Sequence, residues 1–525
     1  MAETPDGPHS GPAITLTASQ GMELSIGSAG DGMHAVLTVR TQGLDAAAPT
    51  ARPMAAEVIV VDCSSSMGYP MTKMRAAREA TVAAVSALRD GTLFGIVQGT
   101  ERAQMVYPPR QALAVADART RAEAIDRARH LHASGGTDMG AWLIQTRRLL
   151  EDCSAQIRHA IMLTDGQHNG PPQVLEEELA RGEGLYTCDA RGIGQDWDAR
   201  ELTRIVTRLH GTADAVLKDS DLTAEFEAMV RASMGRAVAD LRIRVNFLPS
   251  SGIRFFKQMF PTELDLTDTG RQTGLRTVEF PTSAWGNETR QYHLCLKADP
   301  DGAPRYEDLQ LGYVQVLVES ATIPPPDPVP VLVHWTEDSR PSTELHPALT
   351  HLTLYTKLGQ AISRAYDAYE GGDLTTTEVR LSEAVRLAHQ LGDQSLLSRL
   401  ADLLDITDPA AGLVRLRKPV DGVRMGRLLM VSSHTTITPG LDSEPRPQAE
   451  HAPPPGPRTG TPPERFDPLP AADAPRPDGP AQLRSCLNPD CDALLPPDAR
   501  FCIKCQRPVA EPDGQDDGAV EGGTV

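Results

Sequence analysis

Short apolar runs alternate with amphipathic stretches between residues 56 and 234. The runs, such as those in residues 57–62 and 159–165, have the length and composition of buried strands. Between them, apolar residues recur at spacings of three and four, which indicates helices; these stretches are residues 71–89, 121–132, 140–152 and 199–210. Strand and helix in alternation predict an α/β fold, with a mostly parallel sheet covered by helices on both faces.

The regions on either side of this part show shorter, strand-like patterns instead. They occupy residues 13–55 and 235–335. Residues 13–55 have no other obvious partner, so we expect the two regions to pair in one discontinuous β-sandwich. The α/β part, residues 56–234, would then be inserted between the two halves of this sandwich.

The rest of the chain divides by composition. Residues 345–407 show helical periodicity and are predicted as a short α-helical domain. Residues 408–483 are predicted as a linker, which is rich in proline from residue 439. We expect disorder in residues 1–12 and in the acidic tail, residues 511–525.

The net charge of the chain limits the kinds of partner that it is expected to bind. The chain of 525 residues has 70 acidic and 51 basic side chains, a net charge of −19, which disfavours non-specific binding to nucleic acid or anionic membranes. No apolar run approaches the ~18 residues of a membrane helix. The first 39 residues contain no Lys or Arg, whereas a secretory signal begins with a positively charged region. We therefore expect a cytoplasmic protein without a membrane span. The locally basic stretch at 412–427 is expected to dock on the acidic surface of the chain itself.

Oxygen-bearing side chains follow two of the predicted strands and open one helix. The strand in 57–62 ends at Asp62, followed by Ser64 and Ser66; Asp165 ends a later strand; and Thr137 lies in a Gly-rich loop before a helix. Sites of parallel sheets lie at the carboxyl ends of the strands. Hydroxyl and carboxylate oxygens are hard ligands that suit Mg²⁺ or Mn²⁺. The alternative is a plain strand-to-helix turn, with the serines capping the helix that follows.

The spacing D-x-S-x-S, then the threonine, then T-D-G resembles the metal-ion-dependent adhesion site of von Willebrand factor A (vWA) domains, and the resemblance covers residues 56–234. It implies a Rossmann-like, doubly wound domain. It also implies one Mg²⁺ or Mn²⁺ ion, bound by the hydroxyl groups directly and by the two carboxylates through water. At least one position of the ion would stay open for a Glu or Asp of a protein partner. The ligands would be Asp62, Ser64, Ser66, Thr137 and Asp165.

Four of the eight cysteines are bunched in residues 484–510, namely Cys486, Cys491, Cys502 and Cys505. Their spacing, C-x4-C and then C-x2-C, suits tetrahedral Zn²⁺. The segment resembles a zinc ribbon, although its first pair departs from the commoner C-x2-C. The alternative, two disulfides, is disfavoured in the cytosol. The four scattered cysteines are expected to be reduced thiols.

Enzyme signatures are missing from the sequence: it has no G-x-x-x-x-G-K-[ST] phosphate loop and no G-x-S-x-G elbow. We therefore expect no enzyme but a metal-dependent interaction scaffold that binds an acidic residue of a protein partner. A magnesium-dependent phosphoesterase and a zinc-ribbon nucleic-acid binder are the alternatives. The layout looks like that of actinobacterial vWA proteins with a zinc ribbon, which suggests a Ser/Thr kinase or a phosphothreonine-binding protein as partner. Candidate phosphorylation sites are Thr435, Thr436 and Thr438.

Overall fold

The structure, a computed structural model, describes residues 12–26, 32–44, 53–249, 251–300, 303, 305–318, 323–337 and 347–436, and the backbone of 484–485 and 494–495. The chain divides into two units, residues 1–446 and 447–525. In the second unit, β21 (Arg484–Ser485) pairs antiparallel with β22 (Leu494–Leu495). The four cysteines of the predicted zinc ribbon, and Thr438, lie outside the described residues. Within the described ranges, no helix is both long and apolar enough to cross a membrane.

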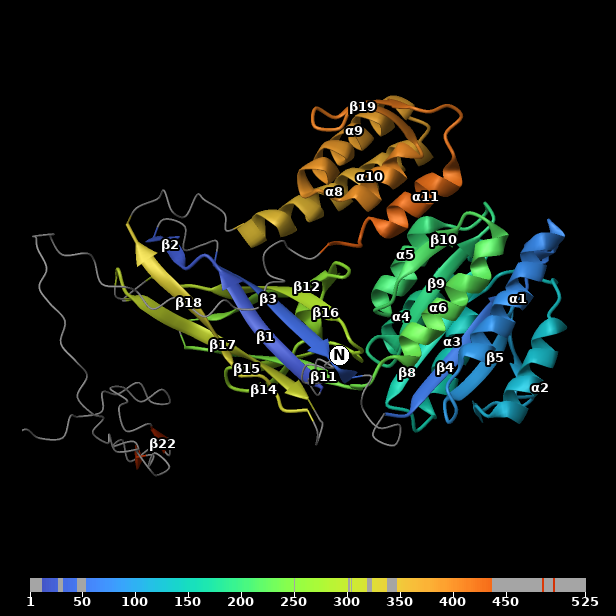
Figure 1. Cartoon of the computed structure of the whole chain (residues 1–525), viewed down its shortest axis with the longest axis horizontal. Coiled ribbons are helices and arrows are strands. Elements are labelled where there is room, and N and C mark those ends of the chain that lie inside the picture. Colours follow the sequence, from blue (N-terminus) through green and yellow to red (C-terminus); the bar gives the residue numbers. More distant parts are fainter. Residues whose placement is uncertain are drawn as a thin grey trace, which may run out of the picture. The chain divides into compact units, whose positions relative to one another are not determined.

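A seven-stranded sheet forms the centre of the α/β part (Figure 1). Its order is β10-β9-β8-β4-β5-β6, and β7 also pairs with β5. Five strands run parallel: β4 (Ala55–Asp62), β5 (Leu93–Gly99), β8 (Ile157–Thr164), β9 (Thr187–Ile193) and β10 (Ala213–Val216). The other two are antiparallel to β5: β6 (Ala103–Tyr107) and β7 (Ala114–Val115).

Helices cover both faces of this sheet, as the alternation of patterns predicted. Along β4, Ile59 and Val61 contribute to the core on one face, whereas Val58 and Val60 contribute to the core on the other. The first face carries α1 (Met71–Ala87), α2 (Ala118–Arg129) and α6 (Leu222–Met234). The second carries α3 (Met139–Glu151), α4 (Pro172–Gly182) and α5 (Ala199–Arg208). Burial on both faces explains why all eight residues of β4 are buried.

One charged side chain interrupts the apolar pattern of β4. Glu57 is fully buried, and its carboxylate contacts Nδ1 of His159 at 2.7 Å and accepts a hydrogen bond from the hydroxyl of Ser233 at 3.0 Å. The other ring nitrogen of His159 lies 3.0 Å from Oδ2 of Asp189. The network therefore connects three neighbouring strands, β4, β8 and β9, with helix α6.

Two further sheets enclose a core of their own, which includes Phe256, Phe280, Trp285, Tyr292 and Trp335. The first has the order β1-β3-β16-β12-β13: β1 (Ala13–Gln20), β3 (Met33–Gln42), β16 (Thr289–Lys297), β12 (Gly252–Phe260) and β13 (Leu264–Asp265). The second has the order β14-β15-β11-β17-β18-β2: β14 (Arg271–Gly274), β15 (Thr277–Pro281), β11 (Leu241–Phe247), β17 (Asp308–Val318), β18 (Val329–Thr336) and β2 (Glu23–Ser25). Strand β3 pairs with β16, so the α/β part is inserted between two strands of one sheet.

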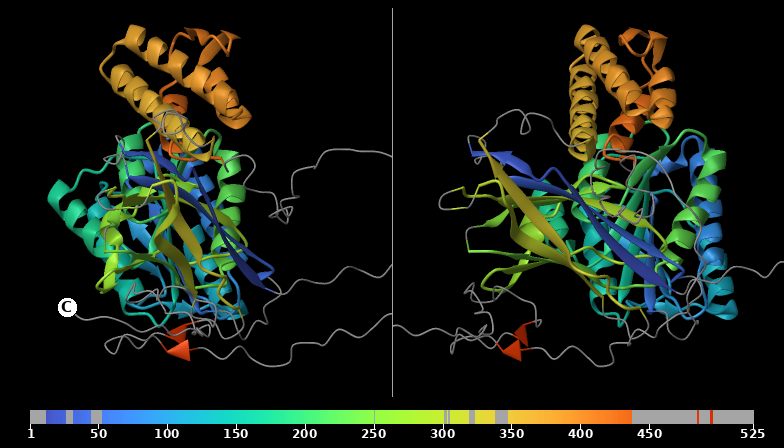
Figure 2. Two further views of the ribbon diagram at one scale, coloured as in Figure 1. Left: turned by 90° about the vertical axis from the view of Figure 1, so that its left-hand side faces the viewer. Right: turned by 60° about the vertical axis from the view of Figure 1, so that its left-hand side comes forward.

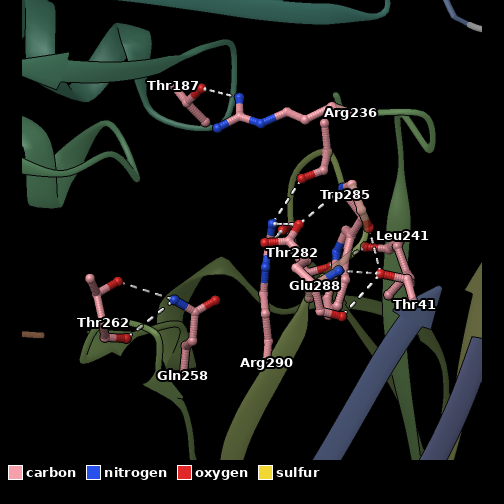
Figure 3. A network of polar contacts seen from close by, with 12 residues as sticks. Thr41, Thr187, Arg236, Leu241, Gln258, Thr262, Thr282, Trp285, Glu288 and Arg290 are labelled. Carbon is pink, nitrogen blue, oxygen red and sulfur yellow. Dashed lines mark hydrogen bonds and ion pairs between the residues drawn. The ribbon is translucent and has the colours of Figure 1, made fainter. Parts of the chain in front are cut away.

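Polar contacts join the inserted part to these sheets (Figure 3). Arg236, between α6 and β11, donates to the hydroxyl of Thr187 on β9 at 3.0 Å. The guanidinium of Arg290 stacks over the ring of Trp285 at 4.2 Å and donates to the carbonyl of Ala284 at 2.8 Å. The amide of Ala237, just after α6, donates to the carbonyl of Trp285 at 2.8 Å and so holds the loop between β15 and β16 beside the end of this helix.

The last part of the first unit is helical and contains one hairpin. Its helices are α8 (Pro347–Glu370), α9 (Leu374–Leu391), α10 (Gln394–Ala401) and α11 (Gly422–Val431). The hairpin consists of β19 (Leu404–Asp408) and β20 (Leu413–Leu416). Figure 2 gives two further views of this group, drawn in orange.

The prediction of a linker from residue 408 is wrong for residues 408–436, which are folded. Asp421 caps α11 by accepting from the amide of Arg424 at 3.1 Å, and the helix buries Met425 and Leu428. Helix α11 packs against α5 and β10. Arg427 donates to both carboxylate oxygens of Asp214 on β10, at 2.7 and 3.2 Å, so the basic stretch does dock on an acidic group of the same chain.

Candidate metal site

The three predicted motifs lie at one edge of the parallel sheet. Strands β5, β4 and β8 are neighbours in the sheet, and their carboxyl ends lie side by side. Asp62 ends β4, and Asp165 follows the last residue of β8. The loop after β5 contacts the Gly-rich loop that contains Thr137, because the carboxylate of Glu101 accepts a hydrogen bond from the amide of Gly136 at 2.8 Å.

The hydroxyl groups of the two serines face each other, and that of Ser66 also faces Asp165. The hydroxyl oxygens of Ser64 and Ser66 are 2.9 Å apart, and the hydroxyl of Ser66 donates to Oδ1 of Asp165 at 2.8 Å. A short 3₁₀ turn, η4 (Ser65–Gly68), brings these side chains together. Helix α1 begins after Pro70 with no side-chain cap. The alternative in which the serines cap this helix is therefore wrong.

Asp62 is a fully buried residue, and each of its two carboxylate oxygens accepts a hydrogen bond. Its Oδ2 accepts from the hydroxyl of Thr164 at 2.6 Å, and its Oδ1 accepts from the amide of Ser64 at 2.8 Å. Burial raises the pKa of Asp62 despite these hydrogen bonds, and the negative charge of Asp165 raises this pKa further. A cation placed between the two carboxylates would relieve both effects.

Thr137 joins the other motifs around Gly166. A Cβ on Gly166 would lie 3.2 Å from Oγ1 of Thr137, 3.8 Å from Oγ of Ser66 and 3.9 Å from Oδ2 of Asp62. Oxygens of the first motif and of Thr137 therefore face one point beside Gly166, and the glycine leaves that point free. The neighbouring Asp138 accepts from the amide of Ala141 at 3.1 Å and is the N-cap of α3, so its role is structural.

Lys73 is a member of the site that the sequence analysis missed. Its Nζ donates to Oδ2 of Asp165 at 2.6 Å and lies 3.4 Å from the carbonyl oxygen of Ser66. The side chain of Lys73 is 7% exposed and that of Asp165 is 0% exposed. One signal was present: Lys73 lies in the first turn of α1, where the helix dipole disfavours a cation.

The donor set fits a hard divalent ion. Three hydroxyl groups and two carboxylates are the ligand types that Mg²⁺ and Mn²⁺ prefer. In the described part of the chain there is no group of three or more His, Cys, Asp or Glu side chains that could hold a metal ion. Cys63, next to Asp62, is buried, and burial raises the pKa of its thiol to about 12, so it stays protonated. The chemistry of the site thus rests on oxygen ligands.

Two large apolar side chains lie at the rim of the site. Tyr69 is 85% exposed and Met71 is 80% exposed. They directly follow η4, and the amide of Tyr69 donates to the carbonyl of Ser66 at 3.2 Å. Neither side chain contributes to the apolar cores, although both residue types are usually half-buried or buried.

The von Willebrand factor type A domain family matches residues 56–215, which include all five predicted ligands. A curated relative, inter-alpha-trypsin inhibitor heavy chain H4 of Sus scrofa, is 25% identical over 181 residues. That match covers 32% of this chain and 19% of the pig protein, so the chain spans about a fifth of this relative.

Two solved structures match most of the chain. The ArnB paralog VWA2 from Sulfolobus acidocaldarius is 14% identical, with a TM-score of 0.47, over 81% of this chain and 100% of that one. A von Willebrand factor type A protein from Catenulispora acidiphila is 35% identical, with a TM-score of 0.73, over 81% of this chain and 97% of that one. With this degree of identity over nearly the whole length of the second protein, and with the fold and the motifs described above, the chain belongs to the von Willebrand factor type A family.

Proposed function

We propose that the chain is a metal-dependent interaction protein whose site binds Mg²⁺ or Mn²⁺ and, through that ion, an acidic side chain of a protein partner. The observation that carries the proposal is the convergence of Ser64, Ser66, Thr137, Asp62 and Asp165 around one point at the sheet edge. Only two of these five ligands are carboxylates. In the proposed arrangement both carboxylates bind through water, so the ion has no directly bound carboxylate and can accept one from a partner at its open position.

The rim supports a protein partner rather than a small anion. Tyr69 and Met71 expose apolar surface directly beside the site. Exposed apolar groups that lie together are typical of surfaces that contact other proteins. We infer that the partner's acidic residue is flanked by apolar side chains that cover this rim.

Other parts of the proposal rest on the sequence alone. The four C-terminal cysteines are proposed to bind Zn²⁺ and to form a second docking module. A cytoplasmic location and a link to Ser/Thr kinases or phosphothreonine-binding proteins also remain proposals. We propose a binding protein and not an enzyme. Asp62 and Asp165 each accept hydrogen bonds within the site, which makes either a poor general base.

The test is ion binding by the full chain. Mn²⁺ is titrated by electron paramagnetic resonance against wild type, Thr137→Val and Asp62→Ala, and Mg²⁺ competes for the same site. Ser86→Ala is the matched control, because this hydroxyl lies on the exposed side of α1 and bonds only to the carbonyl of Val82. We expect one Mn²⁺ site in wild type and Ser86→Ala that is lost in both site variants. Equal binding by all four proteins would refute the assignment.

A second experiment uses the same proteins to capture partners of the chain. A chelator would also remove zinc from the predicted ribbon, so Mg²⁺ is instead withdrawn by dialysis and then restored. Partners of the ion site are those captured by wild type only when Mg²⁺ is present, and not captured by Thr137→Val. Release of phosphate from a generic phosphoester by wild type, but not by Asp62→Ala, would favour a phosphoesterase instead.

A further inference from the structure

The two carboxylate oxygens of Asp165 have different partners, because Lys73 binds one of them. Oδ1 of Asp165 accepts from the hydroxyl of Ser66 at 2.8 Å and so faces the other ligands. Oδ2 is bonded to Nζ of Lys73 at 2.6 Å. Asp165 can therefore offer only one oxygen to an ion, and a bidentate contact would require breaking a buried ion pair.

The residues around Lys73 hold its ammonium group in place beside Asp165. Gly194 has a φ of +78°, and a Cβ on it would lie 2.9 Å from Cε and 3.2 Å from Nζ of Lys73. The loop after β9 thus packs closely against the end of the Lys73 side chain. Asp196 in the same loop lies 3.8 Å from Nζ, but its side chain is 71% exposed, so water screens this second contact. Lys73 is consequently a fixed positive charge beside the ion site.

The charge count of the loaded site depends on this lysine. A divalent ion with Asp62 and Asp165 alone would be neutral overall. With Lys73 included, one net positive charge remains, in a place where both carboxylates are buried and screening by water is weak. The positive charge of Lys73 has opposite effects on the metal ion and on the partner: it repels the incoming cation and attracts a carboxylate.

We propose that Lys73 is a positioning residue that weakens the affinity of the site for its own metal ion and strengthens the affinity of the loaded site for a carboxylate. This inference rests on the proposed function. The ion is bound more weakly than the oxygen ligands alone would allow, whereas the carboxylate of the partner is bound more tightly. Metal loading and partner binding are then coupled, because a carboxylate on the open position stabilises the ion.

The first arm of the test measures the metal alone. Mn²⁺ is titrated into the full chain by electron paramagnetic resonance, comparing wild type, Lys73→Met and Lys73→Gln. Lys218→Met is the matched control, since it removes the same charge from an exposed position before the short helix that precedes α6. We expect both Lys73 variants to bind Mn²⁺ about tenfold more tightly than wild type and the control.

The second arm measures the carboxylate. Acetate is titrated into each Mn²⁺-loaded protein while the relaxation of water protons reports the loss of metal-bound water, and acetamide serves as the uncharged probe. We expect acetate to bind at least about fivefold more weakly to both Lys73 variants. Acetamide should not distinguish the four proteins.

The outcomes separate the inference from the proposed function. If wild type binds no Mn²⁺, the ion site itself is wrongly assigned. If wild type binds Mn²⁺ and the Lys73 variants bind it equally or more weakly, Lys73 only supports the local structure and the inference is overturned. Lys73→Gln keeps a hydrogen-bond donor for Asp165, so it tests the charge even if Lys73→Met fails to fold. Behaviour like wild type in Lys73→Gln also overturns the inference.

Discussion

The hydroxyl of Ser66 donates to Oδ1 of Asp165 at 2.8 Å, although 99 positions separate the two residues in the chain. Ser66 follows β4 and Asp165 follows β8, and these strands are parallel neighbours. The contact is therefore a direct result of sheet order, and it places a neutral ligand and a charged ligand on the same side of the proposed ion.

Replacement of Ser66 by alanine removes one ligand without opening the apolar core. We expect Ser66→Ala to weaken Mn²⁺ binding by about tenfold or more, because an unfilled coordination position must be taken by water. The free energy of unfolding should change by only about 1 kcal/mol, the usual contribution of one hydrogen bond. Isothermal titration with Mn²⁺ and urea unfolding, each against Ser86→Ala, measure the two effects. Mn²⁺ binding by Ser66→Ala that equals binding by wild type would contradict the role of Ser66 as a ligand.

Gly166 leaves the central point of the site free, and a methyl group there would occupy it. We expect Gly166→Ala to abolish measurable Mn²⁺ binding, because the new Cβ would lie 3.2 Å from Oγ1 of Thr137 and close to the oxygens of Ser66 and Asp62. Gly252→Ala is the control, since its Cβ would meet only the side chain of Lys297, at 3.7 Å. Unaltered ion binding in Gly166→Ala would place the ion elsewhere.

The exposed rim should matter for the partner and not for the ion. We expect the double variant Tyr69→Ser, Met71→Ser to bind Mn²⁺ like wild type, because neither side chain belongs to the five proposed ligands. Partner capture in the presence of Mg²⁺ should fall at least about tenfold, since two exposed apolar groups lose their contact area. Unchanged capture by the double variant would show that the partner contacts the ion without covering this rim.

The buried network around His159 predicts how stability depends on pH. Burial disfavours the imidazolium, but the Glu57 carboxylate and the hydrogen bond to Asp189 outweigh it and raise the pKa of His159 to about 9. Because this folded-state pKa is raised from 6.5, the contribution to stability is complete below about pH 6.5 and is lost as the pH rises through 9.

We therefore expect His159→Gln to lower the free energy of unfolding at pH 6 by about 3 kcal/mol, since two buried carboxylates lose their charged partner. The difference between wild type and variant should shrink steadily between pH 7 and pH 10. Urea unfolding at a series of pH values measures it. A difference that stays constant over this range would mean that His159 is neutral in the folded protein.

The parallel sheet and the proximity of the side chains at its strand ends could be predicted from the sequence, because both depend on local patterns. Alternation of apolar runs and helices fixes the strand directions, and strand ends such as Asp62 then meet at one edge. The contact between Lys73 and Asp165 depends on how α1 packs on the sheet, and no spacing in the chain encodes it. Helix α11 was missed for a similar reason, because its apolar face is short and follows a basic, proline-containing segment.

The docking of α11 has a consequence for the molecule as a whole. Strand β10 ends the parallel sheet on one side, and an open strand at such a position offers its backbone to any other extended chain. Helix α11 packs against β10, and Arg427 fixes it there through Asp214. Helix α11 therefore covers part of β10, and we expect a chain that ends before residue 413 to expose this strand to pairing with other extended chains and to aggregate more readily.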